Sequence, residues 1–237
     1  MLSVVVPAHD EAGELPRTIA CLRAGLAGLG VDHEIVVVDN ASTDDTAGVA
    51  RASGARVVHE PYRQISRARN AGAAAATGEW LLFVDADTWP ATELLGRAVD
   101  QLRAGGCGGG ALVAMETLPN RVYRWGLRTW NRVSRRFGWA AGCFVFARRD
   151  GFEAIGGFDE RLFAGDEVFF SRRLRRWGRA RGRAFVVLDA PRVRTSTRKA
   201  YWFSPLQHLL TMLLVVLCPW AMRSRRLMGF WYRRPGR

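Results

Sequence analysis

The segment that most constrains the fold is residues 78–87, where a short apolar run ends in two carboxylates. Trp80-Leu81-Leu82-Phe83-Val84 is typical of a strand buried on both faces of a parallel sheet. Asp85 and Asp87 follow it directly, and ligands of open α/β sheets bind beyond the carboxyl ends of the strands. Strand alternation predicts that both carboxylates point the same way, which favours a cation between them. Oxygen ligands favour Mg²⁺ or Mn²⁺, and a polar turn without a metal is the alternative.

Strands and helices alternate through the first hundred residues. The expected order is strand 2–6, helix 14–28, strand 34–39, a helix whose N-terminus lies at residues 40–45, strand 56–58, helix 66–77 and strand 80–84. This order predicts an α/β fold with a mostly parallel sheet, right-handed crossovers and helices on both faces. With 237 residues, 49% of them hydrophobic, the chain is expected to form one large domain. The glycine-rich residues 105–110 are expected to be a flexible loop.

Charge is divided unevenly along the chain. Residues 1–100 carry 8 basic and 14 acidic side chains, a net charge of −6, whereas residues 101–237 carry 27 basic and 8 acidic ones, a net charge of +19. The second half is therefore expected to meet an anionic partner, such as a membrane surface, a nucleic acid or a phosphorylated substrate.

The cysteines and the first residues indicate a reducing compartment. Four cysteines are scattered without a Cys-x-x-Cys spacing, which argues against a zinc site and against a disulfide framework. The chain enters its first apolar run without a basic segment or cleavage site, so no signal peptide is expected. We therefore expect a cytoplasmic protein.

Five short motifs follow one another in an order known from one enzyme family. They are Val4-Val5-Val6-Pro7-Ala8-His9-Asp10-Glu11, residues 36–44, Ala68-Arg69-Asn70-Ala71-Gly72, residues 80–87 and Gly156-Gly157-Phe158-Asp159-Glu160. Together they resemble the family-two inverting glycosyltransferases of the GT-A fold, over roughly residues 2–178. The resemblance implies a nucleotide-diphosphate-sugar donor, with a UDP-sugar as one candidate, a divalent cation, and direct transfer with inversion at the anomeric carbon.

The same resemblance suggests how the chain is organised. Residues 1–200 would form the GT-A domain, with a nucleotide-sugar-binding half at 1–105 and an acceptor-side half at 106–200. Residues 201–237 would form an apolar and basic tail that associates with a membrane.

Donor-binding roles in the first half come from the resemblance. Pro7, Ala8 and Glu11 would line the pocket for the base and the ribose. Asp39 would accept a hydrogen bond from the base, and a helix-capping carboxylate is the alternative. Arg69 would meet the donor phosphates, although a single arginine on a helix more often lies in solvent.

The resemblance also assigns residues to the metal and to the diphosphate. Asp85 would contact ribose or sugar and assist the metal site, and Asp87 would bind the metal that bridges the diphosphate. Arg198 and Lys199 could close over the diphosphate, and a basic turn beside a membrane explains them nearly as well. His208 is a further, weaker candidate for the metal shell.

Inversion also requires a base that takes the proton of the attacking hydroxyl. Asp166 and Glu167 precede a helical pattern at the position where the family more often has Glu-Asp. Strict register gives the role of base to Glu167, and a shift of one residue gives it to Asp166. Acids at a helix N-terminus are also favoured by the helix dipole, which is the structural alternative.

Residues 121–137 are predicted to form an amphipathic helix. One face carries Val122, Tyr123, Leu127, Trp130, Val133 and Phe137, and the opposite face carries Arg121, Arg124, Arg128, Arg132, Arg135 and Arg136. This composition is typical of a helix at a membrane interface, and a helix packed on the core with its arginines in water is the alternative.

The apolar segment Leu209–Met222 is too short to span a bilayer, and Pro219 interrupts it. It is expected to lie in the membrane interface or to pack on the amphipathic helix.

The leading interpretation is a glycosyltransferase bound peripherally to the inner face of the cell membrane, with a lipid-linked or membrane-proximal acceptor. Four alternatives are weaker. The first loop lacks the Gly-x-Gly-x-x-Gly of a dinucleotide-binding enzyme and the basic glycine-rich loop of a nucleotidyltransferase. A basic nucleic-acid-binding module would leave the acids after the strands unexplained, so no nucleic acid is expected. An inactive glycosyltransferase acting as a scaffold would account for the reversed acid pair.

Overall fold

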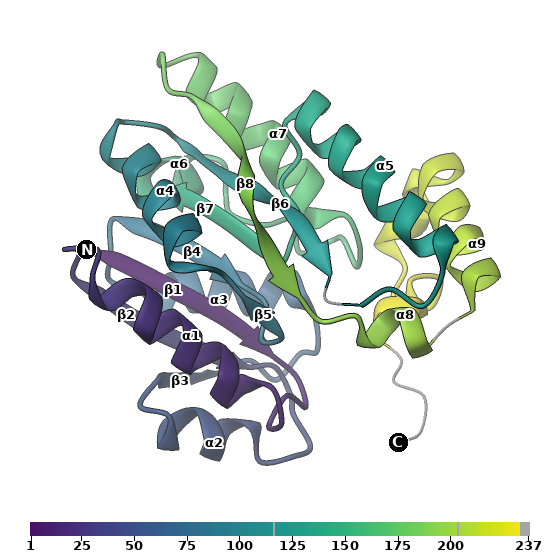
Figure 1. The fold of residues 1–237 in the computed structure, drawn as a ribbon, viewed down its shortest axis with the longest axis horizontal. Coiled ribbons are helices and arrows are strands. Elements are labelled where there is room, and N and C mark those ends of the chain that lie inside the picture. Colours follow the sequence, from purple (N-terminus) through teal and green to yellow (C-terminus); the bar gives the residue numbers. More distant parts are fainter. Residues whose placement is uncertain (116, 203, 233–237) are drawn as a thin grey trace.

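A computed structural model describes residues 1–115, 117–202 and 204–232 (Figure 1). Their strands and helices are, in chain order, β1 (Leu2–Ala8), α1 (Leu15–Ala27), β2 (His33–Asp39), α2 (Thr46–Ala52), β3 (Arg56–His59), α3 (Ile65–Ala75), β4 (Trp80–Val84), β5 (Thr88–Trp89), α4 (Thr92–Arg103), β6 (Gly108–Met115), α5 (Arg121–Phe137), β7 (Phe144–Arg148), α6 (Arg149–Ala154), α7 (Asp166–Arg179), β8 (Phe185–Thr195), α8 (Arg198–Trp202), α9 (Pro205–Leu217), the 3₁₀ helix η1 (Pro219–Arg223) and α10 (Gly229–Tyr232).

The described strands form one sheet in the order β3-β2-β1-β4-β7-β6-β8-β5. β1 pairs in parallel with β2 and β4, and β2 pairs in parallel with β3. β7 is antiparallel to both β4 and β6, whereas β6 and β8 are parallel. The predicted α/β fold with helices on both faces is confirmed, and the sheet is mixed because β7 and the short β5 run against their neighbours.

The central strand β4 divides its side chains between two hydrophobic cores. Leu82 and Val84 belong to the core that contains apolar residues of α1 and α4. Leu81 and Phe83 belong to the core on the other face, which contains residues of α3 and α7. Each fully buried side chain of this size contributes about 1.5–3 kcal/mol, so the strand that precedes Asp85 is held firmly from both sides.

The glycine-rich segment is not a loop throughout, which corrects the expectation for residues 105–110. Gly108, Gly109 and Gly110 begin strand β6 and are buried. A Cβ atom on Gly109 would meet the carbonyl oxygen of Val186 in β8, and one on Gly110 would meet Ala140. The glycines are needed because neighbouring backbone lies too close to this strand for side chains.

Helix α5 has the predicted bounds and packs on the sheet. Its first turn is capped by the Asn120 side chain, and it ends at Gly138 in a left-handed conformation. The Asn131 side chain accepts from the Val113 backbone N–H (3.0 Å) and donates to the Val113 carbonyl (2.8 Å), which fixes the helix on β6. Leu127 packs against the same core, so part of the apolar face serves the fold.

The rest of α5 remains exposed. Val122 and Trp125 are 59% and 65% exposed, and the six arginines of the helix are exposed as well. The membrane role of this helix stays a prediction, while its packing agrees with the structural alternative.

The C-terminal segment packs on a part of the chain that the sequence analysis did not predict as its partner. Ala221, Met222 and Met228 form a small core with Leu162 and Ala164, the residues just before α7. Within the described part of the chain, every helix is either too short or too polar to cross a bilayer. The interfacial location of this segment also stays a prediction.

A matched pair of glycine substitutions tests the packing of β6. Gly110→Ala is expected to lower the free energy of unfolding by about 1–3 kcal/mol, because a methyl group has no space beside Ala140. Gly126→Ala in α5 has open space around its Cβ and is expected to stabilise by about 0.5–1 kcal/mol. Chemical denaturation measures both values, and two changes of the same sign would contradict the assignment.

Candidate active site

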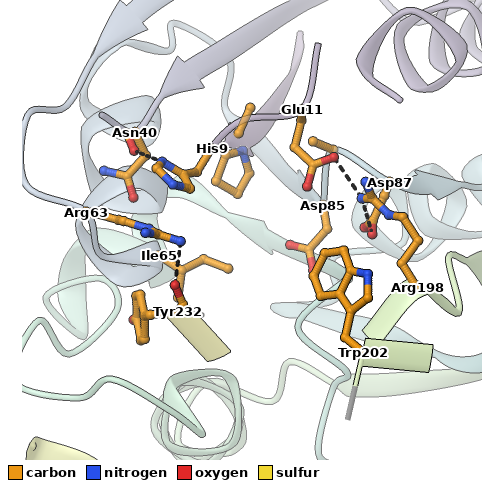
Figure 2. A pocket seen from close by; sticks show the side chains of 13 residues that line it. His9, Glu11, Asn40, Arg63, Ile65, Asp85, Asp87, Arg198, Trp202 and Tyr232 are labelled. Carbon is orange, nitrogen blue, oxygen red and sulfur yellow. Dashed lines mark hydrogen bonds and ion pairs between the residues drawn. The ribbon is translucent and has the colours of Figure 1, made fainter. Parts of the chain in front are cut away.

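A pocket of about 140 Å³ lies at the carboxyl ends of β1, β2 and β4 (Figure 2). Six residues expected at the site line it together: Pro7, Ala8, Glu11, Asp85, Asp87 and Arg198. The sequence analysis assigned no role to the seven further lining residues: His9, Asn40, Arg63, Ile65, Ala86, Trp202 and Tyr232. The loops after the strands form one side of the pocket, and the last part of the chain closes the other.

The loops after β1 and β2 hold each other in place. The backbone N–H of Asp10 donates to the Ser42 hydroxyl (3.1 Å), and the Asp10 carboxylate accepts from the backbone N–H of Thr43 (2.7 Å). The backbone N–H of Glu11 donates to the Thr46 hydroxyl (2.8 Å). These bonds explain why the polar Ser/Thr/Asp segment follows β2, because it orders the loop that carries Glu11.

The end of β8 brings Arg198 to Asp87, although 111 residues separate them. The hydroxyls of Thr88 and Thr195 share a hydrogen bond of 2.9 Å, and the Ser196 backbone N–H donates to the Asp87 carbonyl (3.0 Å). Helix α8 then begins at Arg198. The pairing of β5 with β8 therefore positions this arginine beside the pocket.

Arg198 connects two acids across the pocket. Its Nη2 donates to Asp87 Oδ2 (2.8 Å) and to Glu11 Oε2 (2.7 Å), as Figure 2 shows. Burial opposes its charge, but the two carboxylates outweigh that effect and raise the pKa of Arg198 above its usual value. Arg198 thus places positive charge where the sequence suggested a diphosphate.

Arg69 is the second arginine at the site, and it is only 2% exposed. It donates to Asp166 Oδ2 (2.8 Å), Asp85 Oδ1 (3.2 Å) and the Gly142 carbonyl (2.8 Å). Burial opposes its charge, yet the acids around it raise the pKa of Arg69 above its usual value. Arg69 lies behind Asp85 rather than among the described pocket-lining residues, so its place is neither in solvent nor at the pocket wall.

The two carboxylates after β4 have separate partners. The strand ends at Val84 and the following residues turn, so strand alternation no longer applies. Asp85 pairs with Arg69, and Asp87 pairs with Arg198. Both still line the pocket.

The acid pair begins α7 behind Arg69. Asp166 is buried and bound to Arg69, whereas the Glu167 side chain lies close to Gly142 and Arg69. Burial and the neighbouring Asp166 carboxylate raise the pKa of Glu167 to about 8. Neither acid is among the described residues that line the 140 Å³ pocket, so Arg69 is their link to Asp85.

Three expected residues are placed differently or lie outside the described side chains. Asp39 accepts from the Ser42 backbone N–H (3.1 Å) and lies 3.2 Å from His59 Nδ1, so it orders the turn after β2, while Asn40 lines the pocket. The side chains of Lys199 and His208 are outside the described part of the structure, and their roles stay predictions.

Asp85 and Asp87 suit a divalent cation of a particular kind. No group of three His, Cys, Asp or Glu side chains within residues 1–115, 117–202 and 204–232 could enclose a metal. Mg²⁺ often uses only one or two protein carboxylates and takes its other ligands from phosphates and water. The pair fits such a site, provided that Arg198 releases Asp87 Oδ2.

A model of the glycosyl transferase family 2 matches residues 3–157, more than half of the chain. The chain belongs to this family. An uncharacterized glycosyltransferase, Mb0553 of Mycobacterium bovis, is 43% identical over 86 residues, which are 36% of this chain and 36% of that protein. The undecaprenyl-phosphate 4-deoxy-4-formamido-L-arabinose transferase of Klebsiella pneumoniae is 35% identical over 106 residues, 41% of this chain and 32% of that enzyme. The chain therefore spans about a third of the length of these two relatives.

One solved structure matches a larger share of both chains than these two relatives do. Glucosyl-3-phosphoglycerate synthase from Mycobacterium tuberculosis, in complex with Mn²⁺, UDP and glucosyl-3-phosphoglycerate, superimposes with a TM-score of 0.66. The match covers 94% of this chain and 79% of the synthase at 23% identity. This similarity confirms the predicted GT-A-like fold.

Two Asp–Arg pairs with the same separation test how strongly burial matters. Asp166→Asn is expected to cost about 3–5 kcal/mol of unfolding free energy, because it leaves the buried Arg69 short of negative charge. Asp159→Asn breaks a pair that is also 2.8 Å long, but Arg161 is 73% exposed there. The pKa of Asp159 is lowered to about 2, chiefly by Arg161, yet solvent screening should limit its cost to less than about 1 kcal/mol. Equal costs in urea denaturation would contradict this account.

Proposed function

We propose that this chain transfers a sugar from a nucleotide-diphosphate donor to a lipid-linked or membrane-proximal acceptor, with inversion at the anomeric carbon. The observation that carries the proposal is the junction of Asp87, Glu11 and Arg198 at the carboxyl ends of the strands. Two similarities support the proposed substrates. One relative is named for undecaprenyl-phosphate, and the similar synthase was solved with UDP and Mn²⁺.

The donor occupies the pocket between the strand-end loops. Its base and ribose lie against Pro7, Ala8 and Glu11, with UDP as the favoured nucleotide. Asp39 reaches the base only if it exchanges its contact with His59 for one with the donor. Asn40, which already lines the pocket, is therefore an additional candidate for contact with the base.

Asp87, assisted by Asp85, would hold Mg²⁺ or Mn²⁺ together with the diphosphate. When bound, the cation stabilises the negative charge that accumulates on the leaving diphosphate. Arg198 exchanges Asp87 for diphosphate oxygens as the donor enters, and Lys199 adds a second positive charge. The existing ion pairs keep the acids from repelling each other in the free protein.

Glu167 is the proposed base, and Asp166 positions it. A carboxylate whose pKa is about 8 binds a proton more strongly than an ordinary one, so its deprotonated form, which dominates above about pH 8, is the stronger base. The acceptor hydroxyl gives its proton to Glu167 as its oxygen bonds to the anomeric carbon, and the bond to the diphosphate oxygen breaks. Asp166 is occupied by Arg69, which leaves it the weaker candidate.

Peripheral binding to the inner face of the cell membrane would bring the enzyme to such an acceptor. Val122 and Trp125 of α5 and Leu206 and Leu210 of α9 are all more than half exposed. Exposed apolar side chains together with arginines favour an anionic membrane surface. Tyr232 of the tail lines the pocket, so the proposed membrane-binding part also reaches the site.

Donor hydrolysis across a panel of nucleotide sugars, with Mn²⁺, Mg²⁺ or chelator, tests the proposed function. Asp87→Ala is expected to lower the rate on the order of 100-fold or more, because charge stabilisation of the leaving group is lost. Asp100→Ala removes a carboxylate that is 71% exposed and should leave the rate unchanged. Activity indifferent to both metal and Asp87 would reject the mechanism, and release of pyrophosphate from a sugar phosphate and a nucleoside triphosphate would favour a nucleotidyltransferase.

The base assignment predicts a pH profile. Glu167 must be deprotonated to act, so kcat/KM should rise about tenfold per pH unit below 8 and level off above it. Glu167→Gln should abolish transfer and retain nucleotide binding, which isothermal titration calorimetry measures. Asp166→Asn serves as the comparison. If kcat/KM no longer rises with pH in Asp166→Asn but still does in Glu167→Gln, the base is Asp166.

A further inference from the structure

A second concave site lies between α5 and β8, away from the pocket described above. It is a groove of about 330 Å³ lined by Arg128, Arg132 and Arg135 of α5 and by Arg192 of β8, with Leu112 and Asn131 completing its wall. It has no lining residue in common with the candidate active site. We call these six residues the arginine groove.

The four arginines of the groove have no hydrogen-bond or ion-pair partner anywhere in the described part of the chain. Arg128 and Arg132 are four residues apart on one helix, a spacing at which like charges destabilise a helix. An anion in the groove would remove this repulsion.

Helix α7 shows that the spacing of the arginines does not by itself indicate a site. Arg172, Arg176 and Arg179 repeat the spacing of Arg128, Arg132 and Arg135, are exposed, and likewise have no partner among the described residues. They line neither the candidate active-site pocket nor the arginine groove. The arginine groove differs because Arg192 approaches from a second element across a concave surface.

Hydrogen bonds and packing within the chain hold the backbone that carries the groove. Asn131, whose side chain is buried, binds both the N–H and the carbonyl of Val113 and so sets the distance between α5 and the sheet. Trp130 packs on the core beside it. The guanidinium groups therefore project from a rigid framework, which lowers the entropic cost of collecting them around a ligand.

We propose that the arginine groove is a binding site for a phosphate group. Guanidinium forks match phosphate oxygens in pairs, and four of them supply more donors than a single carboxylate could accept. The phosphate can belong to the headgroup of an anionic phospholipid or to a soluble diphosphate. This proposal stands on the groove alone and does not depend on glycosyl transfer.

Two charge-matched variants of the whole chain test the site. The α5 variant carries Arg128→Gln, Arg132→Gln and Arg135→Gln, and the α7 variant carries Arg172→Gln, Arg176→Gln and Arg179→Gln. Calorimetric titration with pyrophosphate should show one fewer bound ion in the α5 variant than in the wild type and the α7 variant. The candidate active site is intact in all three proteins, so any pyrophosphate bound there is counted equally in each titration.

Vesicle flotation distinguishes the two sources of phosphate. Phosphatidylglycerol vesicles should retain the α5 variant at least tenfold less than the α7 variant if the ligand is a lipid headgroup, with phosphatidylcholine vesicles as the uncharged control. Equal retention of both variants, together with loss of the pyrophosphate site, would assign the groove to a soluble phosphate.

Arg192→Gln supplies a check that changes a single residue outside the helix. It should weaken pyrophosphate binding at the same site at least tenfold, and thermal unfolding monitored by circular dichroism confirms that each variant is folded. The proposal is overturned if the α5 and α7 variants lose pyrophosphate binding equally, or if Arg192→Gln binds like the wild type.

Discussion

The candidate site depends on the burial of one positive charge. Arg69 is almost inaccessible to water, and a buried charge costs several kcal/mol unless opposite charges and hydrogen bonds compensate it. Asp85 from the end of β4, Asp166 from the start of α7 and the Gly142 carbonyl provide that compensation. Three segments far apart in sequence must therefore meet at Arg69, whose own helix α3 packs on β1 and β2. The relation between the proposed donor and base sides of the site follows from this requirement.

Arg198 plays the corresponding role on the open side of the pocket. It balances Glu11 and Asp87, which the loops after β1 and β4 bring together. Its ion pairs are part exposed, in contrast to those of Arg69, so exchange with another cation costs much less. The structure thus contains one fixed and one exchangeable arginine, each holding one of the two acids after β4. That difference, rather than the Asp-x-Asp spacing, favours Asp87 over Asp85 in the proposed metal site.

The sequence predicted local structure well wherever periodicity and burial agreed. Residues 80–84 alternate between two cores as a fully buried strand should, and α5 has the predicted bounds because Asn120 and Gly138 cap it. Gly108–Gly110 was misjudged because the reason for those glycines lies in β8 and Ala140, which a local pattern does not reveal. The same limit explains why Trp202 and Tyr232 were missed, since only the folded chain brings the tail to the pocket.

The pocket and helix α5 show where the charges of the two unequal halves of the chain lie. The acidic first half places Glu11, Asp85 and Asp87 around the pocket, where Arg69 of the same half pairs with Asp85 and Arg198 of the second half pairs with both Glu11 and Asp87. Of the positive charges in the basic second half, these pairs use that of Arg198 alone. The arginines of α5 that face solvent hold no element in place, because the helix is fixed by Asn131 and its apolar contacts. Fold stability therefore does not explain them, and the proposed phosphate site would give a role to the three that line the arginine groove.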